Sequence, residues 1–237
     1  MIQTSELYKS IMAGPHDTQA VVGLHGHNGT VYWLDHTLLS ALFISRGAFS
    51  ADSPECGNCV MSSVELSAIG RYPMPPAGLI EVWAYITDGN RTSEWIKQGV
   101  FYCDQNTYVS DHGQVSTKIT GYDSLGFASQ LVSLDMFQWP CTGLQLIQTA
   151  AGIIWADIDP AIIPILSNIT LQKPDDGGYT LRELMGAVAG VAGGNFVVNK
   201  SNQLTLIRIG DARADTSYIV DELRRSITVG GERILAY

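Results

Sequence analysis

The chain has 237 residues, of which 46% are hydrophobic and 16% are charged, and its net charge is −9. This composition predicts a packed globular protein, and the scarcity of clustered Lys and Arg argues against wrapping nucleic acid. No segment contains the roughly 18 consecutive apolar residues that a membrane span needs, and the N-terminus lacks the pattern of a signal peptide, so we expect folding in a cytoplasm.

The first predicted element is a short N-terminal helix. Thr4 is placed to cap it, Leu7, Tyr8 and Ile11 share one face, and Gly14-Pro15 ends it.

From about residue 18 to residue 123 the sequence is typical of strands and turns. Seven segments rich in Val, Ile, Tyr and Trp are separated by turn-forming residues, at 19–27, 30–39, 42–49, 59–69, 79–86, 97–103 and 115–122. Seven short strands at this spacing predict an antiparallel barrel or sandwich. In the fourth segment, an imperfect alternation predicts that Met61, Val64, Leu66 and Ile69 point inward.

After Asp123 the pattern changes to helices. "TGLQLIQTAAGI" and "TLRELMGAVAGV" align at an offset of 38 residues. Each begins with a capping box, formed by Thr142 with Gln145 and by Thr180 with Glu183. Two amphipathic helices that merely look alike and a true duplication both explain this similarity.

The second helix is followed by a predicted hairpin and a further β segment. Gly193-Gly194 ends the helix, and "NFVVN" and "QLTLIRI" form a hairpin around residues 200–202. Residues 211–237 begin a strand-like pattern that lacks a sheet of its own, so we expect a neighbouring chain or further residues to complete it.

Cys56-Gly57-Asn58-Cys59 is the first candidate for chemistry. A structural zinc site needs four ligands, but Cys103 and Cys141 lie 44 and 82 residues beyond Cys59 and form no second pair. A redox pair would lie between a strand and a helix, whereas the residues that follow here alternate like a strand. The pattern therefore favours a turn that enters a strand, with a metal site and a redox pair as alternatives.

Three histidines and two aspartates are the next candidates. His25 and His27 would point the same way on a strand, but a turn at residues 28–29 places them at an exposed hairpin end, and His36 follows nearby.

Asp157 and Asp159 have the spacing of calcium ligands, but a calcium loop would need a third oxygen ligand where Ala161 stands. A proline-braced loop is favoured. No nucleotide-binding, zinc-protease or nucleophile-elbow motif is present, and we assign no catalytic, cofactor-binding or metal-binding residue.

The order of the segments resembles the N-terminal hub region of tail-tip proteins of long-tailed phages and prophages, similar in fold to the baseplate hub of contractile-tailed phages. The resemblance covers about residues 40–230 and rests on two phrases, "GVFYCD" leading to "KITGYD" and "YTLRELMGAVAGVAGG" with its hairpin. It implies an α+β, mainly β protein: a tube-like antiparallel β-barrel over residues 1–123, a small α+β insert with two similar helices over 124–210, and the start of an incomplete second β domain over 211–237.

The resemblance also implies a function and partners. It implies a homotrimeric ring that closes the tail tube, docks on the distal tail ring (the tube adaptor), holds the tape measure protein in its lumen and lets DNA pass without specific binding. We therefore expect a structural virion protein, assembled in the bacterial cytoplasm, without a membrane span, a cofactor or enzyme activity. Many family members carry a C-terminal cell-wall hydrolase or receptor-binding part, for which the chain up to Tyr237 has no room.

Two other hypotheses come from different classes. A carbohydrate-binding tip module for the host surface would gather exposed Trp residues, such as Trp83 and Trp95, on one face. A cell-wall hydrolase would use a cysteine with a histidine, the candidates being Cys56, Cys59, Cys103 and Cys141.

Overall fold

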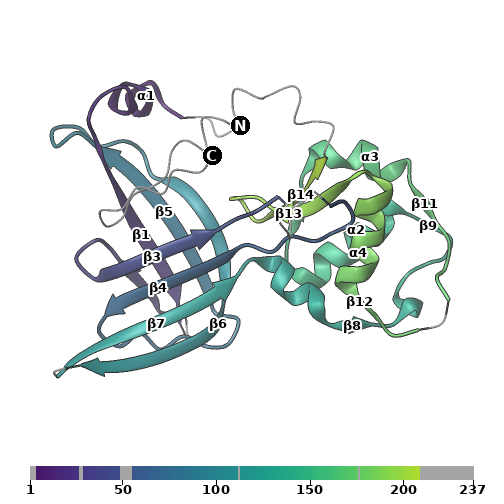
Figure 1. Ribbon diagram of the computed structural model, residues 1–237. Helices are drawn as coiled ribbons and strands as arrows, with labels where there is room; N and C mark the ends of the chain where they lie inside the picture. Colours follow the sequence, from purple (N-terminus) through teal and green to yellow (C-terminus); the bar gives the residue numbers. More distant parts are fainter. Residues whose placement is uncertain (1–3, 27–28, 49–54, 112, 176, 209–237) are drawn as a thin grey trace.

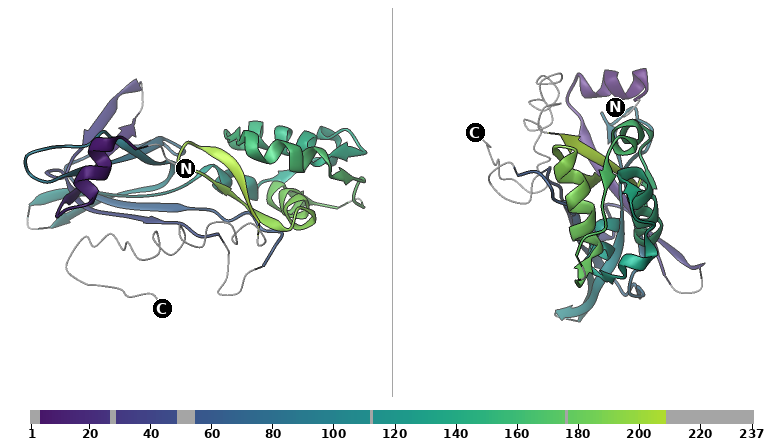
Figure 2. Two further views of the ribbon diagram at one scale, coloured as in Figure 1. Left: turned by 90° about the horizontal axis from the view of Figure 1, so that it is seen from above. Right: turned by 90° about the vertical axis from the view of Figure 1, so that its right-hand side faces the viewer.

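The computed structural model of the protein describes residues 4–26, 29–48, 55–111, 113–175 and 177–208. The fold is mainly β. A large antiparallel sheet, the sheet part, lies beside a smaller part made of helices and short strands, which we call the α+β part (Figures 1 and 2). The predicted second β domain, at residues 211–237, lies outside the described residues.

The elements of the sheet part are α1 (Glu6–Met12), β1 (Asp17–His25), β2 (Val31–Leu34), β3 (Leu39–Ser45), β4 (Ser63–Ile69), β5 (Leu79–Thr87), β6 (Ile96–Asp111) and β7 (Gln114–Tyr122). Those of the α+β part are η2 (Ser124–Ser129), β8 (Leu131–Val132), η3 (Leu134–Met136), β9 (Cys141–Thr142), α2 (Gly143–Ile154), β10 (Asp157–Ile158), η4 (Pro160–Ile162), α3 (Ile163–Ser167), β11 (Thr170–Leu171), β12 (Tyr179–Thr180), α4 (Leu181–Val191), β13 (Gly194–Val198) and β14 (Gln203–Arg208). None of the helices in the described ranges is long and apolar enough to span a membrane.

The seven strands predicted before residue 123 are confirmed, and they form one sheet in the order β2-β1-β5-β6-β7-β4-β3. One hydrophobic cluster draws buried or half-buried side chains from all seven strands, which requires the sheet to curl around it. In β4 the inward residues are Val64, Leu66 and Ala68, as strict alternation demands. The expectation for Ile69 was wrong, since it points outward and is 39% exposed, and Met61 packs against the α+β part instead.

The curled sheet has a seam between its two edge strands, β2 and β3. All six strand pairings are antiparallel, so β2 and β3 run in the same direction. Two neighbouring parallel strands need a connection of about a dozen residues. Only residues 35–38 connect β2 to β3, and hydrogen bonds to Asp35 fold these four residues into a tight turn. In the part of the chain that the structure describes, the sheet is therefore open at this seam, and closure into a tube-like barrel stays a prediction.

One side chain crosses the concave side of the sheet and demonstrates its curl. Arg46, directly after β3, donates a hydrogen bond to the carbonyl oxygen of Gln98 in β6, and its guanidinium lies over the ring of Phe101. Strands β3 and β6 are three places apart in the sheet, so only a strongly curled sheet brings these residues together.

Helix α1 packs at the end of β5. Its N-cap is Ser5 rather than the expected Thr4, because the Ser5 hydroxyl accepts from the Tyr8 amide and donates to the Glu94 carboxylate. Of the predicted apolar face, only Ile11 is fully buried, and Leu7 is 40% exposed.

The α+β part follows the sequence closely. Helices α2 and α4 begin at Thr142 and Thr180, and both predicted capping boxes are formed. Gly193, with φ of 74°, follows the end of α4, and β13 and β14 form the predicted hairpin. The buried faces of α2 and α4 share one hydrophobic cluster with β13 and β14.

Candidate functional site

The Cys-x-x-Cys motif lies in a segment that leaves the sheet part and joins the α+β part. We call residues 55–62 the clasp. The Gly57 amide donates to the Gly194 carbonyl (2.9 Å), the Phe196 amide to the Asn58 carbonyl (2.9 Å) and the Val60 amide to the Phe196 carbonyl (2.8 Å). The clasp thus runs parallel to β13 and forms an isolated β-bridge with it between Cys59 and Phe196, before the chain returns to the sheet as β4.

Backbone packing against helix α4 holds the clasp in place. Gly57 has φ of 93° and lies against Gly186 and Gly190, which are one helical turn apart. A Cβ atom at Gly186 would come within 2.5 Å of the Gly57 carbonyl oxygen. The fully buried Asn195 uses both ends of its amide: its oxygen accepts from Asn58 (2.9 Å) and its nitrogen donates to Glu55 (2.7 Å).

The chain bends at Cys56-Gly57, but no strand follows directly: the next residues bridge to β13, and β4 begins only at Ser63. Cys59 is buried in the core of the α+β part, and burial raises the pKa of its thiol to about 12. Its thiol donates to the Arg182 carbonyl, whereas Cys56 is exposed. Within the described ranges, no group of three or more His, Cys, Asp or Glu side chains could hold a metal ion.

These environments predict which thiol reacts. We expect iodoacetamide to modify Cys56 in the folded protein, while Cys59 and Cys103 react only after unfolding, because burial raises the pKa of the Cys103 thiol to about 11. Peptide mass spectrometry after timed labelling at pH 8, with and without denaturant, measures this. Equal labelling of Cys56 and Cys59 in the folded protein would contradict the buried placement of Cys59.

A buried polar network ties together two places where the chain crosses between the two parts, the step from the clasp to β4 and the step from β7 to η2. The Asp123 carboxylate accepts from the amides of Ser62 (2.7 Å) and Leu125 (3.0 Å) and is 3% exposed. The Arg182 guanidinium donates to the carbonyls of Cys59 (2.6 Å) and Leu125 (2.8 Å). Burial raises the pKa of Asp123, although these bonds and the nearby Arg182 charge oppose the shift.

The histidines are not gathered. His25 lies at the end of the β1–β2 hairpin as expected, paired with Val31, but it belongs to the strand and is only partly exposed; its Nε2 lies 3.2 Å from the Glu81 carboxylate. His36 is exposed in the turn between β2 and β3, and His27 lies outside the described residues. No hydrogen bond or ion pair found among the described residues joins a cysteine to a histidine.

Asp157 and Asp159 fit the proline-braced loop. Asp157 pairs with Gln203 in a parallel ladder, and Asp159 caps η4 by accepting from the Ala161 amide (3.0 Å), with Pro160 at the first helical position. The second carboxylate oxygen of Asp159 accepts from the Thr205 hydroxyl (3.0 Å), so this carboxylate is used within the fold.

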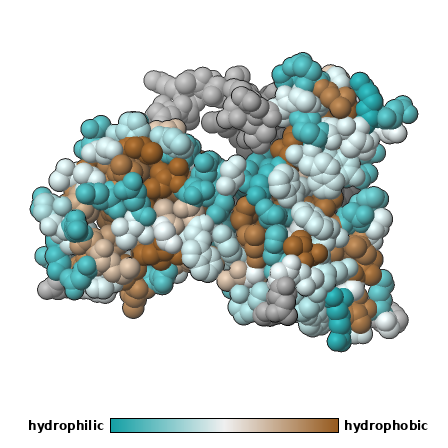
Figure 3. Space-filling model, turned by 180° about the vertical axis from the view of Figure 1, so that it is seen from behind, coloured by the Kyte–Doolittle hydropathy of each residue, from teal (hydrophilic) through white to brown (hydrophobic). Residues whose placement is uncertain are grey.

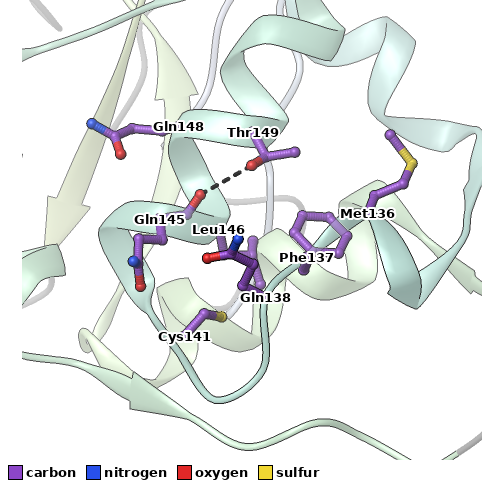
Figure 4. A pocket seen from close by; sticks show the side chains of 8 residues that line it. All are labelled: Met136, Phe137, Gln138, Cys141, Gln145, Leu146, Gln148 and Thr149. Atoms are coloured by element: carbon purple, nitrogen blue, oxygen red, sulfur yellow. Dashed lines mark hydrogen bonds between the residues drawn. The ribbon is translucent and has the colours of Figure 1, made fainter.

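Cys141 lines a pocket of about 330 Å³ in the α+β part (Figure 4). The other lining residues carry amide, hydroxyl or apolar side chains: Met136, Phe137, Gln138, Gln145, Leu146, Gln148 and Thr149. Burial raises the pKa of the Cys141 thiol, and the lining offers no histidine or carboxylate to remove its proton. A cysteine-dependent hydrolase gains no support from this pocket.

The outer face of the sheet, away from its core, carries a cluster of aromatic residues on β2, on β5 and directly before β6. We call Trp33, Trp83, Tyr85 and Trp95 the aromatic face. Trp83 and Tyr85 alternate on β5 with the buried core residues Ile80 and Val82, and the ring of Trp95 packs on that of Tyr85 at 5.1 Å.

Trp33 joins this face because residue 23 is a glycine. Gly23 lies opposite Trp33 on β2 and opposite Glu81 on β5, and the Trp33 ring covers it so closely that a Cβ atom there would lie 3.0 Å from the ring. The sequence predicted Trp83 and Trp95 as exposed rings on one face. Trp95 is exposed there, but the expectation was wrong for Trp83, which is only partly exposed and whose indole nitrogen is buried. Trp33 could be placed only once the register of β1 and β2 was known.

Charged side chains lie between these rings. The Lys97 ammonium binds the Glu81 carboxylate (2.7 Å) and lies 5.2 Å from the centre of the Trp83 ring, and His25 contacts the other oxygen of Glu81. The bonds from Lys97 and His25 lower the pKa of Glu81 despite its partial burial. On the side of the molecule where β1 and β5 lie, hydrophobic side chains form separate patches among hydrophilic ones (Figure 3).

Comparison with known proteins found similar solved structures but no matching sequence family. No protein-family model and no curated protein matches the chain. Its structure is similar to the 43 kDa tail protein of prophage MuSo2 from Shewanella oneidensis, with a TM-score of 0.52 and 12% identity over 80% of this chain and 54% of that one. A tail protein from Neisseria meningitidis MC58 follows, with a TM-score of 0.49, 13% identity, and coverage of 80% of this chain and 51% of that one.

A third similar structure is the Francisella PdpA-VgrG complex, with a TM-score of 0.48, 9% identity, and coverage of 85% of this chain and 30% of the other. The chain thus spans about half the length, or less, of the structures it resembles. It shares the fold of the prophage MuSo2 tail protein.

Proposed function

We propose that the protein is a structural component of a phage or prophage tail, located in the virion at the tail tip. The observation that carries this proposal is the shared fold with the prophage MuSo2 tail protein, which extends over 80% of this chain. The segment order that resembles the hub region of tail-tip proteins points the same way. The features described above, namely the clasp, the Asp123–Arg182 network and the curled sheet, serve to hold the fold together.

The proposed assembly is a homotrimeric ring at the end of the tail tube. In it, the curled sheet closes into or contributes to a tube-like barrel, the distal tail ring lies above, and the tape measure protein and then DNA occupy the lumen. The net charge of −9 supports a channel through which DNA slides without binding, because like charges repel. Residues 1–123, 124–210 and 211–237 would be the first barrel, the insert and the beginning of a second barrel.

Light scattering coupled to size exclusion, followed by negative-stain imaging of the same peak, tests the assembly. We expect a mass three times the 25.7 kDa of one chain and particles with threefold symmetry and an axial hole. A single-chain mass at every concentration, with no ring in the images, would contradict the trimeric ring.

A further inference from the structure

We propose that the aromatic face of the sheet binds a glycan built from hexose units, with Trp33 and Trp95 as exposed stacking rings and Glu81, Lys97 and His25 as partners for sugar hydroxyls. This inference goes beyond the proposed tail function and does not depend on it. It names a ligand-binding surface on the convex side of the sheet.

The first reason is the exposure of the rings. Trp33 is 55% exposed and Trp95 is 49% exposed, although each is held in place by a neighbour, Gly23 under Trp33 and Tyr85 beside Trp95. An indole fixed in one orientation with a free face presents a flat apolar surface at little cost in conformational entropy. The C–H face of a pyranose ring complements such a surface.

The second reason is the pattern of hydrogen-bonding groups between the rings. The side chains of Glu81, Lys97 and His25 are 20%, 28% and 33% exposed, so each keeps contact with solvent while its orientation is fixed by the others. Gln19 and Tyr85 are linked by a further hydrogen bond on the same face. Carboxylate, ammonium, imidazole and amide groups beside aromatic rings offer both acceptors and donors to vicinal hydroxyls.

The third reason distinguishes a glycan from a protein partner. The centres of protein interfaces are depleted of Lys and Glu, because burying an ion pair under an apolar surface costs desolvation energy. Here the Glu81–Lys97 pair lies in the middle of the aromatic face. A sugar, unlike an apolar protein surface, replaces the lost water with its own hydroxyl groups. Because Lys97 balances the charge of Glu81, the chemistry favours neutral hexoses over strongly charged polymers.

The experiment is a printed array of defined hexose oligosaccharides and bacterial polysaccharides, probed with the full chain. We expect several neutral hexose oligomers to bind, and the best of them to change the intrinsic Trp fluorescence with a dissociation constant in the millimolar range, as suits an open face. Trp33→Ala and Trp95→Ala should each weaken binding at least tenfold.

Phe43→Ala is the matched control, because Phe43 is an exposed aromatic residue (61%) on β3 and lies outside the aromatic face. It should bind as the wild type does. Circular dichroism checks that all variants are folded. No binding anywhere on the array, or equal losses for Phe43→Ala and Trp33→Ala, would overturn the proposal. So would a fall in oligomeric mass on Trp33→Ala with glycan binding unchanged, since this would identify the face as a protein interface.

Discussion

Gly186→Ala is expected to lower the free energy of unfolding by about 2 kcal/mol, the cost of adding a methyl group to a packed contact. The new Cβ atom would lie 2.5 Å from the carbonyl oxygen of Gly57, which is backbone and cannot rotate away. Relief requires the clasp to move from helix α4, and this strains its hydrogen bonds to β13. Urea unfolding, followed by circular dichroism, measures the change.

Gly190→Ala is the matched control on the same helix. A Cβ atom there would lie 3.5 Å from Gly57, an ordinary contact distance. Because alanine is the better helix former, this variant should be unchanged or more stable by up to about 1 kcal/mol. An equal loss of stability in the two alanine variants would contradict the prediction, because it would show that the short distance between residue 186 and the Gly57 carbonyl is not what excludes a larger side chain at residue 186.

Asp123→Ala is expected to destabilise the protein by about 2 to 4 kcal/mol. It leaves the amides of Ser62 and Leu125 without a partner, and both residues are at most 4% exposed. Each orphaned buried donor costs about 1 to 3 kcal/mol. Asp135→Ala is the control, since the Asp135 side chain is 88% exposed and lies 3.8 Å from Lys173; it should change stability by less than about 0.5 kcal/mol.

The pH dependence of the stability difference between wild type and Asp123→Ala gives a second test of the role of Asp123. The pKa of Asp123 is raised by burial above its usual 3.8, so the folded state holds this proton more tightly than the unfolded state does. The stability from this difference is fully present below pH 3.8 and is lost as pH rises through the folded pKa. We therefore expect the stability difference between wild type and Asp123→Ala to grow as pH falls from 7 towards 4. A constant difference would contradict the raised pKa.

Local features were predictable from the sequence. The capping boxes at Thr142 and Thr180 and the turn after the second helix depend on residues three or four positions apart, and all are formed. The strands of the sheet part were located because Val, Ile and aromatic residues alternate between turn-forming glycines. The exception at Ile69 shows the limit: a shift of one residue in the assumed alternation sends a side chain to the opposite face.

Long-range features were not predictable. The Asn58 amide binds Asn195 across 137 residues of sequence, and no local pattern in the Cys-x-x-Cys segment marks it as a partner of β13. The spacing of Gly186 and Gly190 is a visible signal of close packing, but it does not say against what. Likewise, Trp33 belongs to the aromatic face only through the register that places it opposite Gly23.

The clasp also sets an order of events during synthesis. Strand β4 can pair with β7 once residue 122 has left the ribosome. The backbone partners of residues 57–60 are residues 194–196, which are synthesised much later. During that interval the nascent clasp is an unpaired strand carrying the apolar Cys59 and Val60, a segment that invites wrong pairing. Chaperone demand and inclusion-body formation should therefore be greater for chains that stop between residues 122 and 194 than for chains that extend through β13.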